Sequence, residues 1–199
     1  MELIFATNNK HKVAEMQLAI GDHFQLITLE EAGIQREIPE PHDTLEANAR
    51  EKSFTIHRLT GKNCFSEDTG LEVTALNGAP GVHSARYAGP GSDPVLNIEK
   101  LLASLHGQTD RHARFRTVIS LIWNGKEHLF TGICPGRIAS HPAGRNGFGY
   151  DPVFIPEGSQ RTFAEMDATE KNVLSHRRKA AEALIGFLKK VAPGDGAKP

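Results

Sequence analysis

Apolar and polar positions along this chain follow patterns that are typical of strands and helices in turn. Alternation at residues 112–123 predicts a strand, and Asn124-Gly125 predicts a type I′ hairpin that leads to a partner strand at residues 126–138. Shorter apolar runs predict further strands at residues 3–6, 24–29, 63–66, 71–76 and 153–155.

Helical patterns lie between these strands. Helical spacing predicts a helix at residues 13–20 and a last helix with Ala180, Ala181, Leu184, Leu188 and Val191 on one face. We expect a further helix that Asp43 opens in a capping box with Glu46 and Gly61 closes, and another from Asp93 to about His106. Interleaved helices and strands with one hairpin predict an α/β fold with a mixed sheet.

The length and composition suit one folded domain. The chain has 199 residues, of which 39% are hydrophobic and 24% charged, so we expect one domain over residues 1–192 and a disordered tail at 193–199. The formal net charge of −1 favours neither nucleic acid nor membrane. No apolar run is long enough for a membrane span and no signal peptide is evident, so we expect a cytoplasmic protein. Cys64 and Cys134 are expected to be buried thiols.

Two adjacent carboxylates, Glu67 and Asp68, lie between an apolar run and a glycine. We expect them where one predicted strand ends and the next has not begun. A carboxylate pair there can hold a hard divalent cation or activate a water molecule. A solvated acidic turn is the alternative, and the pair alone would favour that interpretation.

The first predicted strand leads through Thr7–Lys12 into a helix, which is the arrangement of an anion site. Backbone N–H groups and the helix dipole would face the ligand, and Lys10 and Lys12 add positive charge. The P-loop pattern is absent from the chain. Ordinary turn and cap residues are the alternative interpretation.

Two later segments have ligand-binding character. Residues 144–152 form a glycine-rich loop in which Phe148 and Tyr150 could stack on a planar base, although a plain surface loop is the alternative. Further on, Lys171, Ser175, His176 and Arg177 form a basic cluster, which could be only a solvated helix face. On one unbroken helix Lys171 could not share a ligand with His176 or Arg177, so we expect a helix break near Leu174-Ser175, with Ser175 as N-cap.

Six motifs taken together resemble one family. They are A-T-N-N-x-x-K at the start, E-x-x-x-T-L-x-x-N-A at 40–49, S-E-D-T-G-L-E-V at 66–73, P-G-V-H-S-A-R-Y at 80–87, G-F-G-Y-D-P-x-F at 147–154 and E-K-N-x-x-S-H-R at 170–177. In this set and order the chain resembles the inosine triphosphate pyrophosphatase family, the non-canonical purine nucleoside triphosphate pyrophosphatases.

The resemblance implies hydrolysis of dITP, ITP and XTP to the monophosphate and pyrophosphate, which cleans the nucleotide pool. It also implies dependence on Mg²⁺, a homodimer, and an elongated α/β fold with the active-site cleft between two lobes. Asp68 matches the catalytic acid/base, and Glu40 and Asp68 match the metal ligands. Substrate contacts are implied at Thr7, Asn8, Asn9, Lys10, His11, Lys12, Thr69, Phe148, Gly149, Tyr150, Asp151, Lys171, His176 and Arg177.

This chain departs from the family pattern at two positions. Many members have glycine where this chain has Asn8, but asparagine adopts positive φ at modest cost, so we do not read the change as loss of function. Glu67 replaces an aspartate found in some members, and its role stays open. We expect His176 and Arg177 to donate to purines with a 6-oxo group, which would exclude ATP.

Two other interpretations remain open at this point. The first is a house-cleaning pyrophosphatase of the related Maf group, with a different base preference. The second is a nucleotide-binding regulatory module without turnover, against which the presence of Glu40, Asp68 and Lys12 argues.

Overall fold

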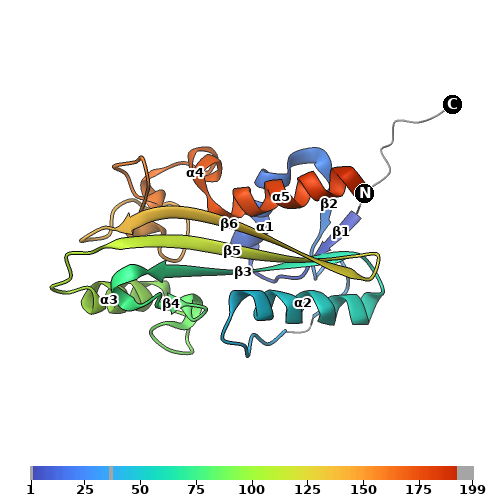
Figure 1. Ribbon diagram of the computed structural model, residues 1–199, viewed down its shortest axis with the longest axis horizontal. Helices are drawn as coiled ribbons and strands as arrows, with labels where there is room; N and C mark the ends of the chain where they lie inside the picture. The colour runs from blue at the N-terminus through green and yellow to red at the C-terminus, as the bar shows by residue number, and fades with distance from the viewer. Residues whose placement is uncertain (1, 36–37, 192–199) are drawn as a thin grey trace.

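A seven-stranded mixed sheet forms the centre of the computed structural model, which describes residues 2–35 and 38–191 (Figure 1). Strand β1 is parallel to β2 and β3, and the other pairings are antiparallel. The order across the sheet is β2 (Gln25–Ile27), β1 (Glu2–Phe5), β3 (Cys64–Val73), β5 (His112–Trp123), β6 (Lys126–Ile138) and β7 (Phe154–Pro156), with β4 (Pro80–Gly81) also beside β3.

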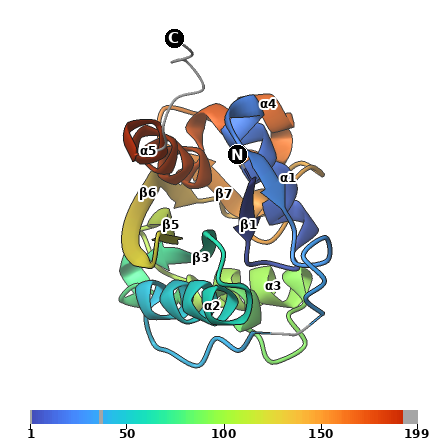
Figure 2. The same cartoon turned by 90° about the vertical axis from the view of Figure 1, so that its right-hand side faces the viewer.

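Helices cover both faces of the long strands. Helices α1 and α5 lie together on one side of the sheet and α2 lies on the other (Figure 2). The helices are α1 (Lys10–Ile20), α2 (Leu45–Thr60), α3 (Pro94–Ser104), α4 (Ala168–Leu174) and α5 (His176–Val191), and short 3₁₀ turns occupy Gly21–His23, Thr74–Leu76, Ser84–Arg86, Asp151–Val153 and Phe163–Glu165. The predicted elongated mixed sheet flanked by helices is thereby confirmed.

Several local predictions are confirmed as well. Gly61 ends α2 in the left-handed conformation with φ of 66°. Asn124 and Gly125 both have positive φ, as a type I′ hairpin requires. The predicted break between the last two helices falls at Ser175, which is extended and whose Oγ accepts a hydrogen bond from the Arg178 N–H at 3.0 Å. Cys64 and Cys134 are buried.

Three local predictions are wrong. The separate strands at 63–66 and 71–76 are one strand, β3, and Thr74–Leu76 is a 3₁₀ turn. Asp43 does not cap α2: Thr44 does, by accepting from the Ala47 N–H at 3.1 Å. With Thr44 as the N-cap, the third helical residue is Ala47, so Glu46 is not in the capping-box position. Glu46 pairs with Arg116 of β5 instead, at 2.5 Å.

A polar band separates two hydrophobic clusters. Leu3, Phe5 and Phe65 belong to the cluster that α1 and α5 cover, and Leu71 and Phe115 belong to the cluster that α3 helps to form. Between them on the same strand faces lie Glu67, Thr69 and Thr117, since side chains alternate along β3 and β5. The two cores give the molecule two lobes, and the polar band lies where they meet.

Close packing fixes the start of α5 against the sheet. A Cβ atom on Gly132 of β6 would lie 2.0 Å from the His176 carbonyl oxygen and 2.4 Å from the Ala180 nitrogen. Only glycine therefore lets the first turn of α5 approach the strand so closely. This contact therefore sets the position of His176 and Arg177, the residues that open α5.

The predicted tail at 193–199 lies outside the described residues. Within residues 2–35 and 38–191, no helix has the length and apolar character needed to cross a membrane.

Candidate active site

The site is built around an open edge in the middle of β3. Strand β1 pairs with β3 only at Cys64 and Phe65, and β4 pairs with it only at Leu71 and Glu72. Among the described residues, no strand covers the edge between these pairings. The sequence predicted that Glu67 and Asp68 lie where their own strand ends, and this prediction is wrong. They lie within β3, beside the point where β1 ends.

Glu67 faces α1 and α5 and is enclosed by cations. The Arg177 guanidinium donates to it through Nε at 2.7 Å and Nη2 at 2.8 Å, and Lys12 Nζ lies 3.3 Å from Oε1. Burial alone would raise the pKa of Glu67, but Arg177 first, then Lys12 and Lys52, hold it well below its ordinary value. Glu67 is therefore an anion that fixes these cations in place.

Glu15 of α1 joins two of the predicted substrate-binding cations. Its carboxylate lies 2.6 Å from Lys171 Nζ and pairs through its other oxygen with Arg177 Nη1. The sequence reasoning missed Glu15, although it lies one helical turn after Lys12 and so shares its face. Helix α1 thus connects the phosphate-loop lysine with the residues on either side of the break at Ser175.

Arg177 is more enclosed than a substrate-contacting donor was expected to be. Its side chain is 1% exposed, and its N–H groups reach Glu67, Glu15 and, at 3.4 Å, Thr69 Oγ1. The predicted contact with a purine base would require one of these carboxylates to be displaced. That contact stays a prediction, and the geometry assigns Arg177 first to Glu67.

The glycine-rich loop meets the same cluster. Asp151 Oδ2 accepts from Lys171 Nζ at 2.5 Å and from the Phe148 N–H at 2.7 Å, which ties the loop to α4. The Lys171 ammonium lies 4.9 Å from the centroid of the Phe148 ring. His11, another predicted contact, stacks on the same ring, with centroids 5.1 Å apart. The structure therefore brings Lys171, Asp151 and Phe148 together, as predicted.

Two of the predicted rings are enclosed. Tyr150 is buried in the hydrophobic core, and its hydroxyl donates to the Ser84 carbonyl at 2.8 Å. The prediction that its ring stacks on a base is therefore wrong. His176 stacks on Phe115 at 4.7 Å. Burial, with help from Arg177, lowers the pKa of His176 well below its ordinary value, so the ring is neutral. Its Nδ1 is buried without a partner among the described residues.

The loop before α1 is shaped by its own side chains. Asn9 caps α1 by accepting from the His11 and Lys12 N–H groups at 3.0 and 3.2 Å, and Thr7 Oγ1 accepts from the Asn9 N–H at 3.2 Å. Asn8 is not among the described residues with positive φ, so glycine is not required there. Lys12 points at the site, whereas Lys10 is exposed.

Asp68 faces the opposite side, toward α2. The Lys52 ammonium pairs with Glu40 Oε1, lies 3.8 Å from Asp68 Oδ1 and donates to the Glu67 carbonyl at 2.7 Å. Burial raises the pKa of Asp68, Lys52 opposes this, and Glu40 adds to it. The second oxygen, Oδ2, is buried without a partner among the described residues. Lys52 is the second residue that the sequence reasoning missed.

These residues fit a divalent cation. The described residues hold no ready-made group of three or more histidine, cysteine, aspartate or glutamate ligands. The Glu40 carboxylate lies close enough to Asp68 to help raise its pKa. One Asp68 oxygen has no partner among the described residues. Mg²⁺ commonly takes one or two carboxylates and completes its shell with water and substrate phosphates, so the donor set suits it.

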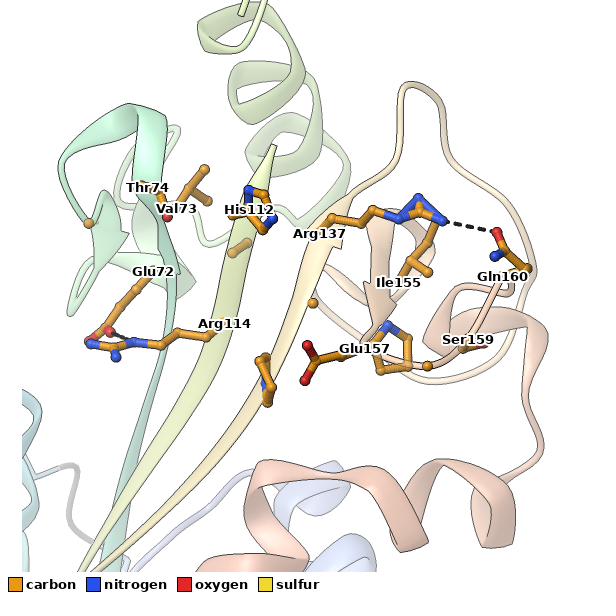
Figure 3. Close-up of a pocket in the computed structure, with 16 residues that line it drawn as sticks. Glu72, Val73, Thr74, His112, Arg114, Arg137, Ile155, Glu157, Ser159 and Gln160 are labelled. Atoms are coloured by element: carbon orange, nitrogen blue, oxygen red, sulfur yellow. Dashed lines mark hydrogen bonds and ion pairs between the residues drawn. The ribbon is translucent and has the colours of Figure 1, made fainter. Parts of the chain in front are cut away.

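A separate groove lies at the far end of the sheet. It has a volume of about 680 Å³, and His112, Arg114, Arg137 and Glu157 are among its lining residues (Figure 3). None of the predicted site residues lines it. The carboxylates and lysines of the predicted site therefore lie in the middle of β3, on its two faces, and not at this groove.

The fold and the site together define an α/β protein suited to a ligand that carries several phosphates. Lys12, Lys52 and Arg177 meet the carboxylates of Glu67 and Asp68 at one edge of β3. Residues 3–187 match the Ham1 family, and the chain belongs to that family. This membership confirms the resemblance drawn from the six motifs.

Relatives and solved structures agree with this assignment. The dITP/XTP pyrophosphatase of Flavobacterium psychrophilum is 48% identical over 95% of this chain and 100% of its own length. The Ham1 protein of Coxiella burnetii is 38% identical, with a TM-score of 0.88 over 96% of this chain and 100% of that chain. A nucleoside-triphosphatase, dITP/XTP pyrophosphatase, from Mycobacterium abscessus is 39% identical, with a TM-score of 0.76 over 92% and 98%.

Proposed function

We propose that this protein hydrolyses the non-canonical purine nucleoside triphosphates dITP, ITP and XTP to the nucleoside monophosphate and pyrophosphate. The observation that carries the proposal is the Asp68 carboxylate, which lies beside Glu40 and Lys52 and has one oxygen without a hydrogen-bond partner among the described residues. On the other face of the same strand, Glu67 pairs with Lys12 and Arg177. Membership of the Ham1 family and the printed names of the relatives, dITP/XTP pyrophosphatase, support the substrate class.

The residues divide the reaction between them. Lys12 and the N–H groups that open α1 bind the triphosphate, and a Mg²⁺ ion held by Glu40 and Asp68 would neutralise charge on its oxygens. Asp68 takes a proton from the attacking water. The water oxygen bonds to the α-phosphorus, the bond from that phosphorus to the bridging oxygen breaks, and pyrophosphate leaves. In the protein without a bound cation, burial raises the pKa of Asp68, and its Oδ2 has no partner among the described residues, so this oxygen can accept the proton.

The base would lie next to Lys171. A cavity of about 290 Å³ opens there, with Glu15, Phe163, Lys171 and Ser175 among its lining residues. Phe148 lies against the same lysine and provides a ring for stacking. Neutral His176, with its unpartnered Nδ1, lies just after Ser175 and is our candidate for reading the base edge. Thr69 and Gly149 complete the proposed contacts.

We propose that the homodimer implied by the family resemblance forms through the exposed face of β6, which runs from Leu129 toward the far groove at Arg137. Leu129 and Ile133 of β6 are 41% and 36% exposed on one face of the strand. At the groove end of this face, Arg137 donates to Gln160 at 3.2 Å, and neither Arg137 nor Glu157 forms an ion pair within the described residues. A two-fold contact pairs such a cation with such an anion twice. Equilibrium sedimentation should give a dimer, and Ile133→Asp a monomer; a wild-type monomer would exclude the dimer.

One experiment tests the activity. Purified protein with Mg²⁺ is given ITP, dITP, XTP, GTP, ATP and pyrimidine triphosphates, and products are followed by phosphorus NMR. We expect pyrophosphate from the first three only. Preference for another base would favour the Maf-like alternative, absence of turnover the regulatory module, and stoichiometric orthophosphate would contradict attack at the α-phosphorus. We further propose that the protein works in the cytoplasm and without nucleic acid, in line with its net charge of −1.

A further inference from the structure

Glu40, one of the two proposed cation ligands, lies outside regular secondary structure. Residues 38–44 are neither helix nor strand, and they lead into the N-cap of α2 at Thr44. The sheet therefore fixes Asp68 but not Glu40. The distance between the two carboxylates depends on whatever holds this segment.

The side chain of Asn48 holds it at one residue. Asn48 Oδ1 accepts from the His42 N–H at 2.9 Å, and Nδ2 donates to the His42 carbonyl at 3.1 Å. Asn48 is 0% exposed. Two hydrogen bonds from one rigid amide to one backbone residue set both position and orientation, and each is expensive to leave unmade in a buried place.

The same helix also reaches the second carboxylate. Lys52, one helical turn after Asn48 on α2, pairs with Glu40 and lies 3.8 Å from Asp68 Oδ1. Helix α2 therefore holds the segment that carries Glu40 through Asn48, and joins Glu40 to Asp68 through Lys52.

We propose that Asn48 is a positioning residue that sets the separation of Glu40 and Asp68 and thereby the affinity of the site for a divalent cation. This rests on the proposed function, in which the two carboxylates hold that cation. A residue that orients ligands in this way typically contributes roughly 10- to 100-fold to metal affinity. Asn48 touches neither the nucleotide nor the cation in this account.

The test measures cation affinity apart from turnover. Mn²⁺ binding is followed by electron paramagnetic resonance in protein saturated with inosine α,β-methylene-triphosphate, whose α–β bridge is not hydrolysed. Asn48→Leu should weaken Mn²⁺ binding by about 10-fold or more. Asn63→Ala is the control, because it removes a 2.8 Å hydrogen bond from a backbone N–H, at Asn124, far from the cation site. Where Asn48→Leu does not fold, Asn48→Gln replaces it, since its longer amide cannot make both bonds to His42.

A double-mutant cycle separates positioning from a general effect on the fold. In a Glu40→Gln background, Asn48→Leu should add little further loss of Mn²⁺ affinity, because the ligand it positions is gone. Additive losses, or a loss shared by Asn63→Ala, would overturn the proposal. If Glu40→Gln itself leaves Mn²⁺ affinity unchanged, the proposed metal ligands are wrong, which is a different failure.

Discussion

The Arg177 guanidinium meets the Glu67 carboxylate in a two-pronged contact of 2.7 and 2.8 Å, with side chains that are 1% and 0% exposed. Such a pair stabilises the fold only while both members are present, because a charge left alone in the interior has lost its water. Arg177 is thus tied to stability as well as to the proposed substrate.

Arg177→Ala should lower the free energy of unfolding by about 3–5 kcal/mol, since it leaves the buried Glu67 charge with Lys12 as its main partner. Urea unfolding measures this. Combining Arg177→Met with Glu67→Leu should recover most of the loss, because the two fully buried charges are removed together, Glu15 keeps Lys171 as its partner, and Lys12 is 17% exposed. A double variant as unstable as Arg177→Ala would show that packing around the guanidinium, rather than the ion pair, is what matters.

Asp68→Asn should remove nearly all turnover and leave the fold intact. Loss of the proton acceptor and of a cation ligand together should lower kcat on the order of thousands-fold. The matched control is Asp110→Asn, an aspartate at the far end of the sheet that pairs with His112. A variant of Asp68 that keeps more than a tenth of the wild-type rate would refute the catalytic role.

The raised pKa of Asp68 predicts a pH-dependent cost in stability. A carboxyl whose folded-state pKa exceeds its unfolded-state value binds more protons when folded, so its charged form destabilises the fold at high pH. Without divalent cations, Asp68→Asn should therefore be more stable than wild type above the folded-state pKa. This advantage should shrink as pH falls through that pKa and vanish below roughly pH 4.

Urea midpoints of both proteins across this range measure the effect. Asp110→Asn should show no such advantage, because the backbone N–H of His112 lowers the pKa of Asp110 instead. An advantage of Asp68→Asn that grows on acidification would mean that the sign of the pKa shift is wrong.

Lys12→Ala should raise KM for ITP far more than Lys10→Ala does. The Lys12 ammonium lies 3.3 Å from Glu67 and its side chain is 17% exposed, whereas Lys10 is exposed and has no ionic partner among the described residues. Steady-state kinetics of the two variants decide it. Equal effects would indicate a diffuse patch of charge in place of a defined contact.

The sequence predicted the elements of this fold well because most of them are set locally. The glycine at position 61 and the Asn124-Gly125 pair act through their own backbone angles, and the break at Ser175 follows from helical geometry. The continuity of β3 escaped prediction because buried carboxylates are tolerated there only through Arg177 and Lys52. These partners lie far away along the chain.

The same reason explains what the site prediction lacked. The motifs indicated Lys12, Lys171 and Asp68, whereas Glu15 and Lys52 are recognised as members only when their helices pack beside these residues. Tyr150 looked like a stacking ring because aromatic character in a glycine-rich loop says nothing about which ring turns inward.

Strand β3 separates two adjacent carboxylates by the alternation of its side chains. Its pairing with β5 runs without a bulge from Cys64 opposite Ile122 to Val73 opposite Ala113. A single residue inserted or deleted upstream of Glu67 within this strand would send Asp68 toward Arg177 and its neighbour toward Lys52. Insertions in surface loops such as 88–93 leave this parity untouched. The chain can therefore vary in loop length during evolution, but the count of residues from Cys64 to Asp68 must stay fixed.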